Sequence, residues 1–271
     1  MVEEKMAKET ISYVSRLPRY RQLDETRLRN GTESMAIEFP DTSVIIPTLN
    51  EEETISHVVK EFIRPRGTVS CDVTIVDGHS KDQTVKWAKR AGARVLLQKS
   101  RGKGMAMVEG VMNTSDSKLC IFVDGDGTYS ASDLNSIVKP IVNGSADMVI
   151  GSRLKGIREK GSMPPINVVG NKLCTLLVKL FFKTDISDLL SGYRAVKAST
   201  FKKLGLKGGH FEIEVEMTVK ALVQGLRVHD VPITYLRRRG KPAKLRPFKD
   251  GILILKVLLW EILNSRRKRA R

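Results

Sequence analysis

Two carboxylates follow an apolar run in the middle of the chain, and they are the side chains best suited to do chemistry. Asp124 and Asp126 lie in the tetrad 124–127, Asp-Gly-Asp-Gly, directly after the run 119–123. In an extended or tightly turning segment, residues i and i+2 point to the same side, so both side chains can share one hard cation. A divalent cation there would neutralise a diphosphate. The alternative is a surface turn, since Asp and Gly are common turn residues.

A regular alternation of apolar strands and helices must hold this pair in place. It begins near residue 43, and its helices are about ten residues long. Such alternation predicts an α/β fold with a mostly parallel sheet and helices on both faces, and ligands of such sheets bind beyond the carboxyl ends of the strands. We predict strands at 43–47, 72–76, 93–97, 118–123, 147–151, 194–196 and 226–235, and helices at 51–63, 81–91, 102–113, 131–142, 168–182 and 211–224.

Residue types suited to binding also follow the other predicted strands. Asp77 follows the second strand, where a carboxylate could accept hydrogen bonds from a base or ribose. Lys103 lies between two glycines at a helix start after the third strand, a favourable setting for phosphate. Arg153 follows the fifth strand, and Pro47 and Asn50 follow the first. Several such loops at one sheet edge are a stronger signal than any single loop.

Each loop also has a simpler explanation. Asn50 can cap the following helix, while Glu51 and Glu52 favour its positive end. In the second loop, Ser80 or Asp82 can cap the next helix. A single Gly-Lys-Gly is weak evidence for a phosphate site, so the argument rests on the loops taken together.

Taken in order, the motifs resemble those of the GT-A nucleotide-sugar glycosyltransferases. The second half of the chain is similar to the dolichyl-phosphate sugar synthases, notably archaeal ones, and the likeness covers about residues 43 to 251. The motifs are Val44–Pro47 with Asn50-Glu51, Val76-Asp77, Gly102–Gly104, Asp124–Asp126, Gly151–Arg153, Asp188–Arg194, Phe211–Glu214, and Val231–Tyr235 followed by Arg238, Gly240 and Lys244-Leu245.

The resemblance implies a metal-dependent, inverting transfer of a hexose from a nucleoside-diphosphate sugar to dolichyl or polyprenyl phosphate, as in protein glycosylation. GDP-mannose, UDP-glucose and UDP-N-acetylglucosamine stay open as donors. It implies that Asp124 and Asp126 bind Mg²⁺ or Mn²⁺, with Asp126 as the main ligand. The implied nucleotide-sugar-binding residues are Pro47, Asn50, Glu52, Asp77, Lys103, Asp124 and Asp126.

Cations should dominate the acceptor side of such a site. An ionised phosphate monoester already carries a nucleophilic oxygen, so the reaction needs no strong general base. Guanidinium groups suit bidentate phosphate contacts. We expect Arg153, Arg194, Arg238 and Lys244 to contact the acceptor phosphate and the departing diphosphate, and Asp126, Arg153, Arg194 and Arg238 to form the catalytic set.

The chain departs from the family pattern at three places. Gly78 stands where related synthases often carry a second acid, and Thr128 replaces a Gln that sometimes contacts the metal. The arginine expected before the apolar helix is not evident in Met163–Asn167. These departures bear on acceptor geometry and on which sugar is transferred.

Composition and charge narrow the class of protein. The 271 residues are 41% hydrophobic, which supports a real core, and the formal net charge is +17. The segment 237–271 alone holds thirteen basic residues against Asp250 and Glu261, which favours polyanions such as phosphorylated substrates, anionic lipids or nucleic acid. The three cysteines lie far apart, without the spacing of a zinc site or disulfide framework, so a reducing cytoplasm fits best.

The C-terminal segment indicates a membrane surface. Gly251–Leu263 is apolar but too short to span a bilayer, and the basic run Arg266–Arg269 follows it. We expect an interfacial helix with Trp260 near the headgroups and a second contact from helix 168–182. The alternative is a core or dimer helix. No run reaches about 18 apolar residues, so we expect a peripheral protein on the cytoplasmic membrane face.

Three regions and two alternative functions complete the predictions. We expect a polar extension at 1–40 with a short helix near 5–16, a GT-A catalytic domain at 41–246 and the amphipathic basic helix at 247–271. One alternative is a soluble GT-A enzyme acting on a small phosphorylated acceptor such as a phosphoglycerate. The other is a nonenzymatic nucleic-acid binder, which is disfavoured because aromatics make up 6% and no base-stacking module is evident. The oligomeric state stays open.

Overall fold

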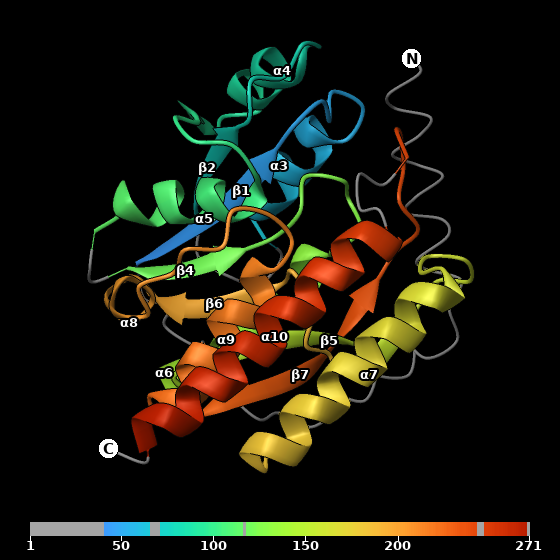
Figure 1. Ribbon diagram of the computed structural model, residues 1–271. Helices are drawn as coiled ribbons and strands as arrows, with labels where there is room; N and C mark the ends of the chain where they lie inside the picture. Colours follow the sequence, from blue (N-terminus) through green and yellow to red (C-terminus); the bar gives the residue numbers. More distant parts are fainter. Residues whose placement is uncertain (1–40, 66–70, 116–117, 243–246, 270–271) are drawn as a thin grey trace, which may run out of the picture. The chain divides into compact units, whose positions relative to one another are not determined.

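The computed structural model describes residues 41–65, 71–115, 118–242 and 247–269 (Figure 1). The chain divides into two compact units, 1–36 and 37–271, and everything below concerns the second. The predicted N-terminal extension and its helix near 5–16 lie outside the described residues.

A seven-stranded, mostly parallel sheet forms the centre of this unit, which confirms the predicted fold class. Its strand order is β3-β2-β1-β4-β6-β5-β7, and β6 runs antiparallel to both of its neighbours. The parallel order β3-β2-β1-β4 brings the loops that follow β1, β2 and β4 to one edge. The strands are β1 (Thr42–Thr48), β2 (Asp72–Asp77), β3 (Arg94–Leu97), β4 (Leu119–Phe122), β5 (Met148–Arg158), β6 (Arg194–Lys197) and β7 (Val228–Tyr235).

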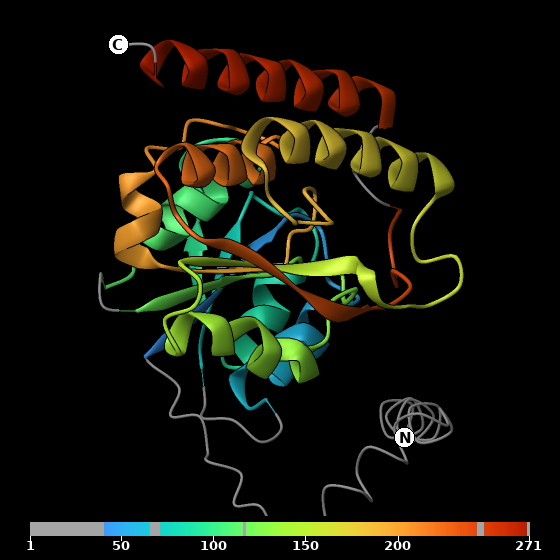
Figure 2. The ribbon, with the colours of Figure 1, turned by 90° about the horizontal axis from the view of Figure 1, so that it is seen from below.

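Helices cover both faces of the sheet, and each face has its own apolar core (Figure 2). Successive side chains of a strand point to opposite faces, so Ile45 enters one core while Val44 and Ile46 enter the other. One face carries α3 (Ile55–Ile63), α4 (Thr84–Arg90) and α6 (Leu134–Val142), and the other carries α5 (Lys103–Met112), α7 (Pro165–Phe182), α8 (Ala198–Lys203), α9 (Ile213–Val223) and α10 (Pro247–Arg269).

Each predicted strand and helix of the described residues is present, with shifted boundaries. The short 3₁₀ turn η1 (Ala131–Asp133) precedes α6, and α8 was not predicted because six residues show too little periodicity. The prediction that Asn50 caps the first helix is wrong. Thr54 is the N-cap residue of α3, and Asn50 takes a left-handed conformation with φ of 51°, which Asn tolerates.

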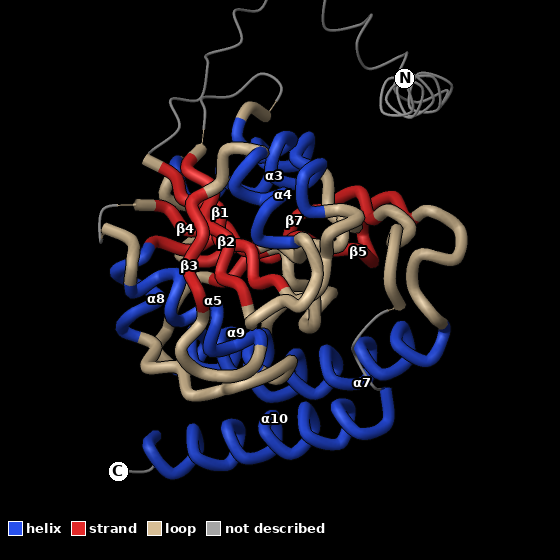
Figure 3. Tube along the Cα trace, turned by 90° about the horizontal axis from the view of Figure 1, so that it is seen from above, coloured by secondary structure: helices blue, strands red, loops and turns tan. Residues whose placement is uncertain are grey.

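Two long helices, α7 and α10, form the outermost layer of one face and pack against each other (Figure 3). Over its 18 residues α7 has a mean hydropathy of 1.3, so by length and composition it could cross a membrane, contrary to our expectation that no segment would. Its inner face, with Asn171, Cys174, Thr175 and Val178, is buried within the unit. α10 packs on α9 and α7, and its Ile254, Leu258 and Ile262 join the same core.

We predict that Asp133→Asn stabilises the protein at neutral pH. Burial raises the pKa of Asp133 from 3.8 to about 6, although its carboxylate accepts a hydrogen bond from the Thr234 amide at 2.7 Å. The ionised carboxylate therefore costs the folded state about 3 kcal/mol above pH 6, and this cost vanishes as the pH falls toward 4. The Asn oxygen keeps the bond to Thr234 without the charge.

Urea unfolding at pH 7.5 and pH 4.5 measures the effect. Asp147→Asn is the control, and its free energy of unfolding should change in the opposite direction, because hydrogen bonds and charge from Arg227 lower the pKa of Asp147. This second variant should lose stability by a similar amount at both pH values, because the contribution of a carboxylate with a lowered pKa fades only below its ordinary pKa of 3.8. Equal stability of Asp133→Asn and the unaltered protein at pH 7.5 would contradict the prediction.

Candidate active site

The two carboxylates of the loop after β4 lie close enough for their charges to interact. Burial raises the pKa of Asp126, and the negative charge of Asp124 raises it further. Asp126 Oδ1 accepts hydrogen bonds from Thr128 N at 3.1 Å and Thr128 Oγ1 at 2.7 Å. Thr128, which stands in place of a Gln that sometimes contacts the metal, thus orients the Asp126 carboxylate and leaves Oδ2 facing a different partner.

Lys103 neutralises Asp124 and links it to a third acid. Lys103 Nζ lies 2.6 Å from Asp124 Oδ1 and 2.8 Å from Glu214 Oε1. Burial alone would lower the pKa of Lys103, but the two carboxylates raise it well above its usual value, so the ammonium stays charged. Gly192 closes one wall of this cluster, since a Cβ there would lie 3.1 Å from Asp124 Oδ2 and 3.2 Å from Lys103 Nζ.

Arg238 neutralises Asp126 in the same way. Its Nη1 lies 2.5 Å from Asp126 Oδ2, and its Nη2 lies 2.8 Å from Glu51 Oε1. We call residues 236–242, which follow β7 and carry Arg238, the strap. Arg238 Nε donates to the carbonyl oxygen of Lys241 at 2.6 Å, which stiffens the strap. The strap therefore ties the loop after β4 to the loop after β1.

A second cation of the strap extends this tie to the loop after β2. Lys241 Nζ lies 2.7 Å from Asp82 Oδ2 and 3.5 Å from Glu52 Oε1. Partial burial works in the opposite direction, but hydrogen bonds from Lys241 and Thr84 lower the pKa of Asp82 to about 2. The strap thus contacts three of the loops that the sequence predicted to converge.

The loops after β1 and β2 are also bonded directly to each other. Asp77 is buried, and its carboxylate accepts from Ser80 N at 2.8 Å and Ser80 Oγ at 2.5 Å. Asn50 Oδ1 accepts from Lys81 N at 2.7 Å, and Glu52 Oε2 accepts from Gln83 N at 3.0 Å. These bonds hold three of the predicted nucleotide-binding residues in one assembly, next to Pro47 at the end of β1.

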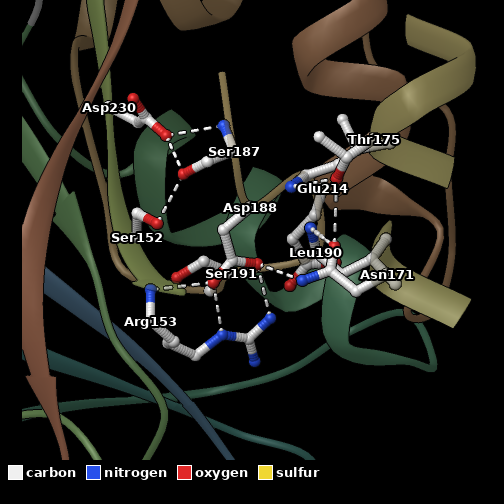
Figure 4. A network of polar contacts seen from close by, with 12 residues as sticks. Ser152, Arg153, Asn171, Thr175, Ser187, Asp188, Leu190, Ser191, Glu214 and Asp230 are labelled. Carbon is white, nitrogen blue, oxygen red and sulfur yellow. Dashed lines mark hydrogen bonds and ion pairs between the residues drawn. The ribbon is translucent and has the colours of Figure 1, made fainter. Parts of the chain in front are cut away.

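Arg153 lies beside the site and is held by a buried acid. Its Nε and Nη2 each donate to the Asp188 carboxylate at 2.8 Å (Figure 4). The guanidinium lies over the ring of Tyr235, 5.3 Å from the ring centroid. Burial raises the pKa of the Tyr235 phenol, Arg153 lowers it, and the charges of Asp126 and Asp124 raise it, so this ring lies near all three charged groups.

Arg194 does not reach the site, which corrects the prediction that it contacts phosphate. Its side chain is fully buried and donates to Ser191 O at 2.7 Å, Leu189 O at 2.5 Å and Thr218 Oγ1 at 2.7 Å. Burial lowers the pKa of Arg194 to about 10. The remaining predicted cation, Lys244, lies outside the described residues.

Several residues of the site were missed or misread in the sequence. Glu51 was read as a helix-end charge, although it shares Arg238 with Asp126. Glu214 and Asp188 occur in motifs that carried the resemblance, which was the one signal available for them. Tyr235 also occurs in such a motif. Lys241 and Tyr129 gave no signal, because their places depend on packing between distant segments, as in the bridge between Tyr129 and Tyr235.

A mixed sheet of this order, with helices on both faces, is the GT-A fold. The family model described as glycosyl transferase family 2 matches residues 43–205. The chain belongs to this family, and it is an enzyme of the glycosyltransferase class.

Relatives and solved structures agree with this assignment. The chain is 37% identical over 217 residues to the glycosyltransferase AglJ of Haloferax volcanii, covering 79% of this chain and 70% of that one. It is 29% identical to a dolichyl-phosphate hexose transferase of the same organism, covering 84% and 96% of the two chains. Glucosyl-3-phosphoglycerate synthase of Mycobacterium tuberculosis, solved with Mn²⁺, UDP and phosphoglyceric acid, shares the fold with a TM-score of 0.65 at 20% identity, covering 82% and 78%.

We predict that Arg194→Lys affects stability and leaves catalysis intact. A lysine cannot replace all three hydrogen bonds, and each buried acceptor left without a partner costs about 1 to 3 kcal/mol. Chemical denaturation should show a loss of at least about 2 kcal/mol, whereas kcat/KM of the folded variant should stay within about twofold. A large loss of kcat/KM without a loss of stability would return Arg194 to the catalytic set.

Proposed function

We propose that this enzyme transfers a hexose from a nucleoside-diphosphate sugar to dolichyl or polyprenyl phosphate, with a divalent metal and with inversion at the anomeric carbon. The observation that carries the proposal is the pair Asp124 and Asp126, each held by a cation at the edge where the loops converge. Two relatives support the acceptor, since one is named a dolichyl-phosphate hexose transferase and another, from Methanococcus voltae, transfers N-acetylglucosamine to dolichyl phosphate.

The donor half of the site fits a metal-bound diphosphate. Among the described residues, no group of three or more His, Cys, Asp or Glu could enclose a metal ion. Asp124 and Asp126 would hold the metal through their carboxylate oxygens, and Mg²⁺ usually takes its other ligands from water and substrate phosphates. When bound, the metal supplies electrostatic stabilisation of the departing diphosphate. Burial raises the pKa of Asp126 and repulsion from Asp124 raises it further, which fits this site because a shared cation would stabilise both ionised carboxylates.

Residues of the chain supply the remaining steps. The loops that carry Asn50, Glu52 and Asp77 hold the nucleotide, and the charged Lys103 faces the sugar diphosphate. The acceptor phosphate needs no strong base, because its ionised oxygen attacks the anomeric carbon directly. Arg153 and Arg238 then donate hydrogen bonds to the acceptor phosphate and to the leaving group.

The acceptor also requires a membrane surface, and α7 with α10 provides the face that fits one. Most of the large exposed hydrophobic side chains of the described residues lie on these two helices, which pack side by side (Figures 2 and 3). Exposed Lys172, Lys183 and Lys256 add positive charge, and the sequence continues into the basic run Arg266–Arg269. The exposed apolar residues are Ile166, Val169, Leu173, Leu176, Leu180 and Phe181 on α7 and Ile252, Leu253, Leu259, Trp260 and Leu263 on α10.

This composition fits an anionic bilayer better than another protein. Apolar helices that also carry lysine are typical of segments that lie in the headgroup region, with each basic side chain near the surface worth about 1 kcal/mol. α10 begins six residues after Lys241, so its first turn lies within about 20 Å of the strap. A peripheral position on the cytoplasmic face would thus bring a lipid phosphate close to Arg238.

We predict that a nucleoside-diphosphate sugar stabilises the protein in the presence of a divalent metal and not in its absence. A ligand at about one hundred times its Kd adds about 2.7 kcal/mol to the unfolding free energy. Thermal shift with UDP-glucose, UDP-N-acetylglucosamine and GDP-mannose, each with Mn²⁺ or with EDTA, measures this. Asp126→Asn should lose the metal-dependent part of the shift, and the surface variant Asp72→Asn should keep it. Equal shifts with and without metal would contradict the metal site.

We also predict that the apolar face of α10 binds anionic vesicles. The triple variant Ile252→Glu, Trp260→Glu, Leu263→Glu should lose at least about tenfold in co-flotation with phosphatidylglycerol vesicles, since it places charge where the bilayer would lie. The matched control changes Leu97 and Met112 to Glu. These two side chains are 61% and 58% exposed, as exposed as Trp260 at 60%, but lie on β3 and α5. Flotation of the triple variant equal to that of the control would rule out this face.

A further inference from the structure

A buried polar network connects α7, the helix proposed to face the membrane, to Arg153 (Figure 4). Asn171 lies on the inner face of α7, and its Nδ2 donates to Asp188 Oδ1 at 2.6 Å. Its Oδ1 accepts from Leu190 N at 3.2 Å and from Thr175 Oγ1 at 3.3 Å, which fixes the carboxamide. Asp188 in turn holds Arg153, so one residue separates the helix from the guanidinium.

The Asp188 carboxylate is saturated by this network. Oδ2 accepts from Arg153 N and Arg153 Nε, each at 2.8 Å, and Oδ1 accepts from Arg153 Nη2 at 2.8 Å and from Asn171. The side chain is fully buried. Burial alone would raise the pKa of Asp188, but the charge and hydrogen bonds of Arg153 lower it, so the carboxylate stays ionised. The fork geometry fixes the orientation of the guanidinium as well as its position.

The segment that carries Asp188 does not need this carboxylate for its own anchoring. On one side, Ser187 N donates to Asp230 Oδ2 at 2.6 Å, and Ser187 Oγ lies 2.7 Å from Ser152 Oγ. On the other side, the buried Arg194 binds the carbonyl oxygens of Leu189 and Ser191. Three of the four hydrogen bonds accepted by Asp188 come from Arg153, so its carboxylate serves chiefly to hold that residue.

One nitrogen of Arg153 stays free for a ligand. Nη1 has no hydrogen-bond partner among the described residues, and Figure 4 shows it pointing away from Asp188. The Tyr235 ring under the guanidinium lies near the charges of Asp124 and Asp126 as well. Arg153 therefore presents a fixed, charged donor beside the carboxylate pair.

We propose that Asp188 and Asn171 are positioning residues that aim Arg153 at the acceptor phosphate, which rests on the proposed function. Because Asn171 belongs to α7, the same helix that exposes Leu173 and Leu176 outward sets the position of Arg153 inward. The network thus sets the distance between the guanidinium of Arg153, which would contact the phosphate, and the exposed apolar face of α7.

Steady-state kinetics of the full chain test this with Asp188→Asn and Asn171→Ala. Both variants should lose about ten- to a hundredfold in kcat/KM for a short-chain polyprenyl phosphate, mainly through KM, because a misplaced arginine misaligns the acceptor. Donor affinity should stay within about twofold, since the donor loops are untouched. The matched control is Val178→Ala, which removes a fully buried side chain from the same helix and should lower Tm without changing the acceptor KM. Acceptor kinetics of Asp188→Asn equal to those of Val178→Ala would overturn the proposal.

A binding experiment separates this proposal from the reaction itself. The Nε–Hε NMR signal of Arg153, assigned by its loss in Arg153→Lys, should move when farnesyl phosphate is titrated into the unaltered protein. In Asp188→Asn the midpoint should rise by about ten- to a hundredfold. A moving signal without sugar transfer would support the positioning role while refuting the proposed acceptor. A signal that stays still in the unaltered protein would overturn the positioning role, whether or not transfer occurs.

Discussion

Asp124 and Asp126 are partly buried and repel each other, so the structure depends on cations from other segments of the chain that neutralise them. Burying an isolated charge is costly, and burying two of the same sign costs more, so each acid needs its own cation. Lys103 supplies one and Arg238 the other, and each cation is shared with a further acid, Glu214 or Glu51. The charge network therefore joins the loop after β4 to α5, α9, the loop after β1 and the strap.

The sheet order explains how so many segments reach one place. Parallel strands β3, β2, β1 and β4 end at the same edge, while antiparallel β6 separates β4 from β5. This insertion places the segment 186–193, with Asp188 and Gly192, between the carboxylate pair and α7. Arg194, the first residue of β6, holds that segment in place by donating hydrogen bonds to the carbonyl oxygens of Leu189 and Ser191. Its burial is therefore part of how the site is built.

The sequence predicted the local parts of this arrangement and missed the long-range ones. Strand and helix alternation follows from the periodicity of apolar residues, and it placed Asp77, Lys103 and Asp124 correctly at element ends. The pairing of Arg238 with Asp126 spans 112 positions, and no local pattern encodes it. Arg153 and Arg194 looked equivalent as phosphate ligands. Their roles differ because Arg153 meets a carboxylate and keeps one nitrogen free, whereas Arg194 meets two carbonyls and a hydroxyl.

The balance of acidic and basic side chains differs between the donor side and the acceptor side of the proposed site. On the donor side, the acids outnumber the cations that hold them, since Asp124, Glu214, Asp126 and Glu51 share Lys103 and Arg238. A surplus of negative charge there is compatible with a diphosphate when a divalent cation arrives with it. On the acceptor side, Arg153 has a single carboxylate partner, so that end is already balanced before a phosphate binds. A phosphate monoester there depends on the directed Nη1–H and on the exposed lysines of α7 and α10, which makes the precise aim of Arg153 more important than its charge.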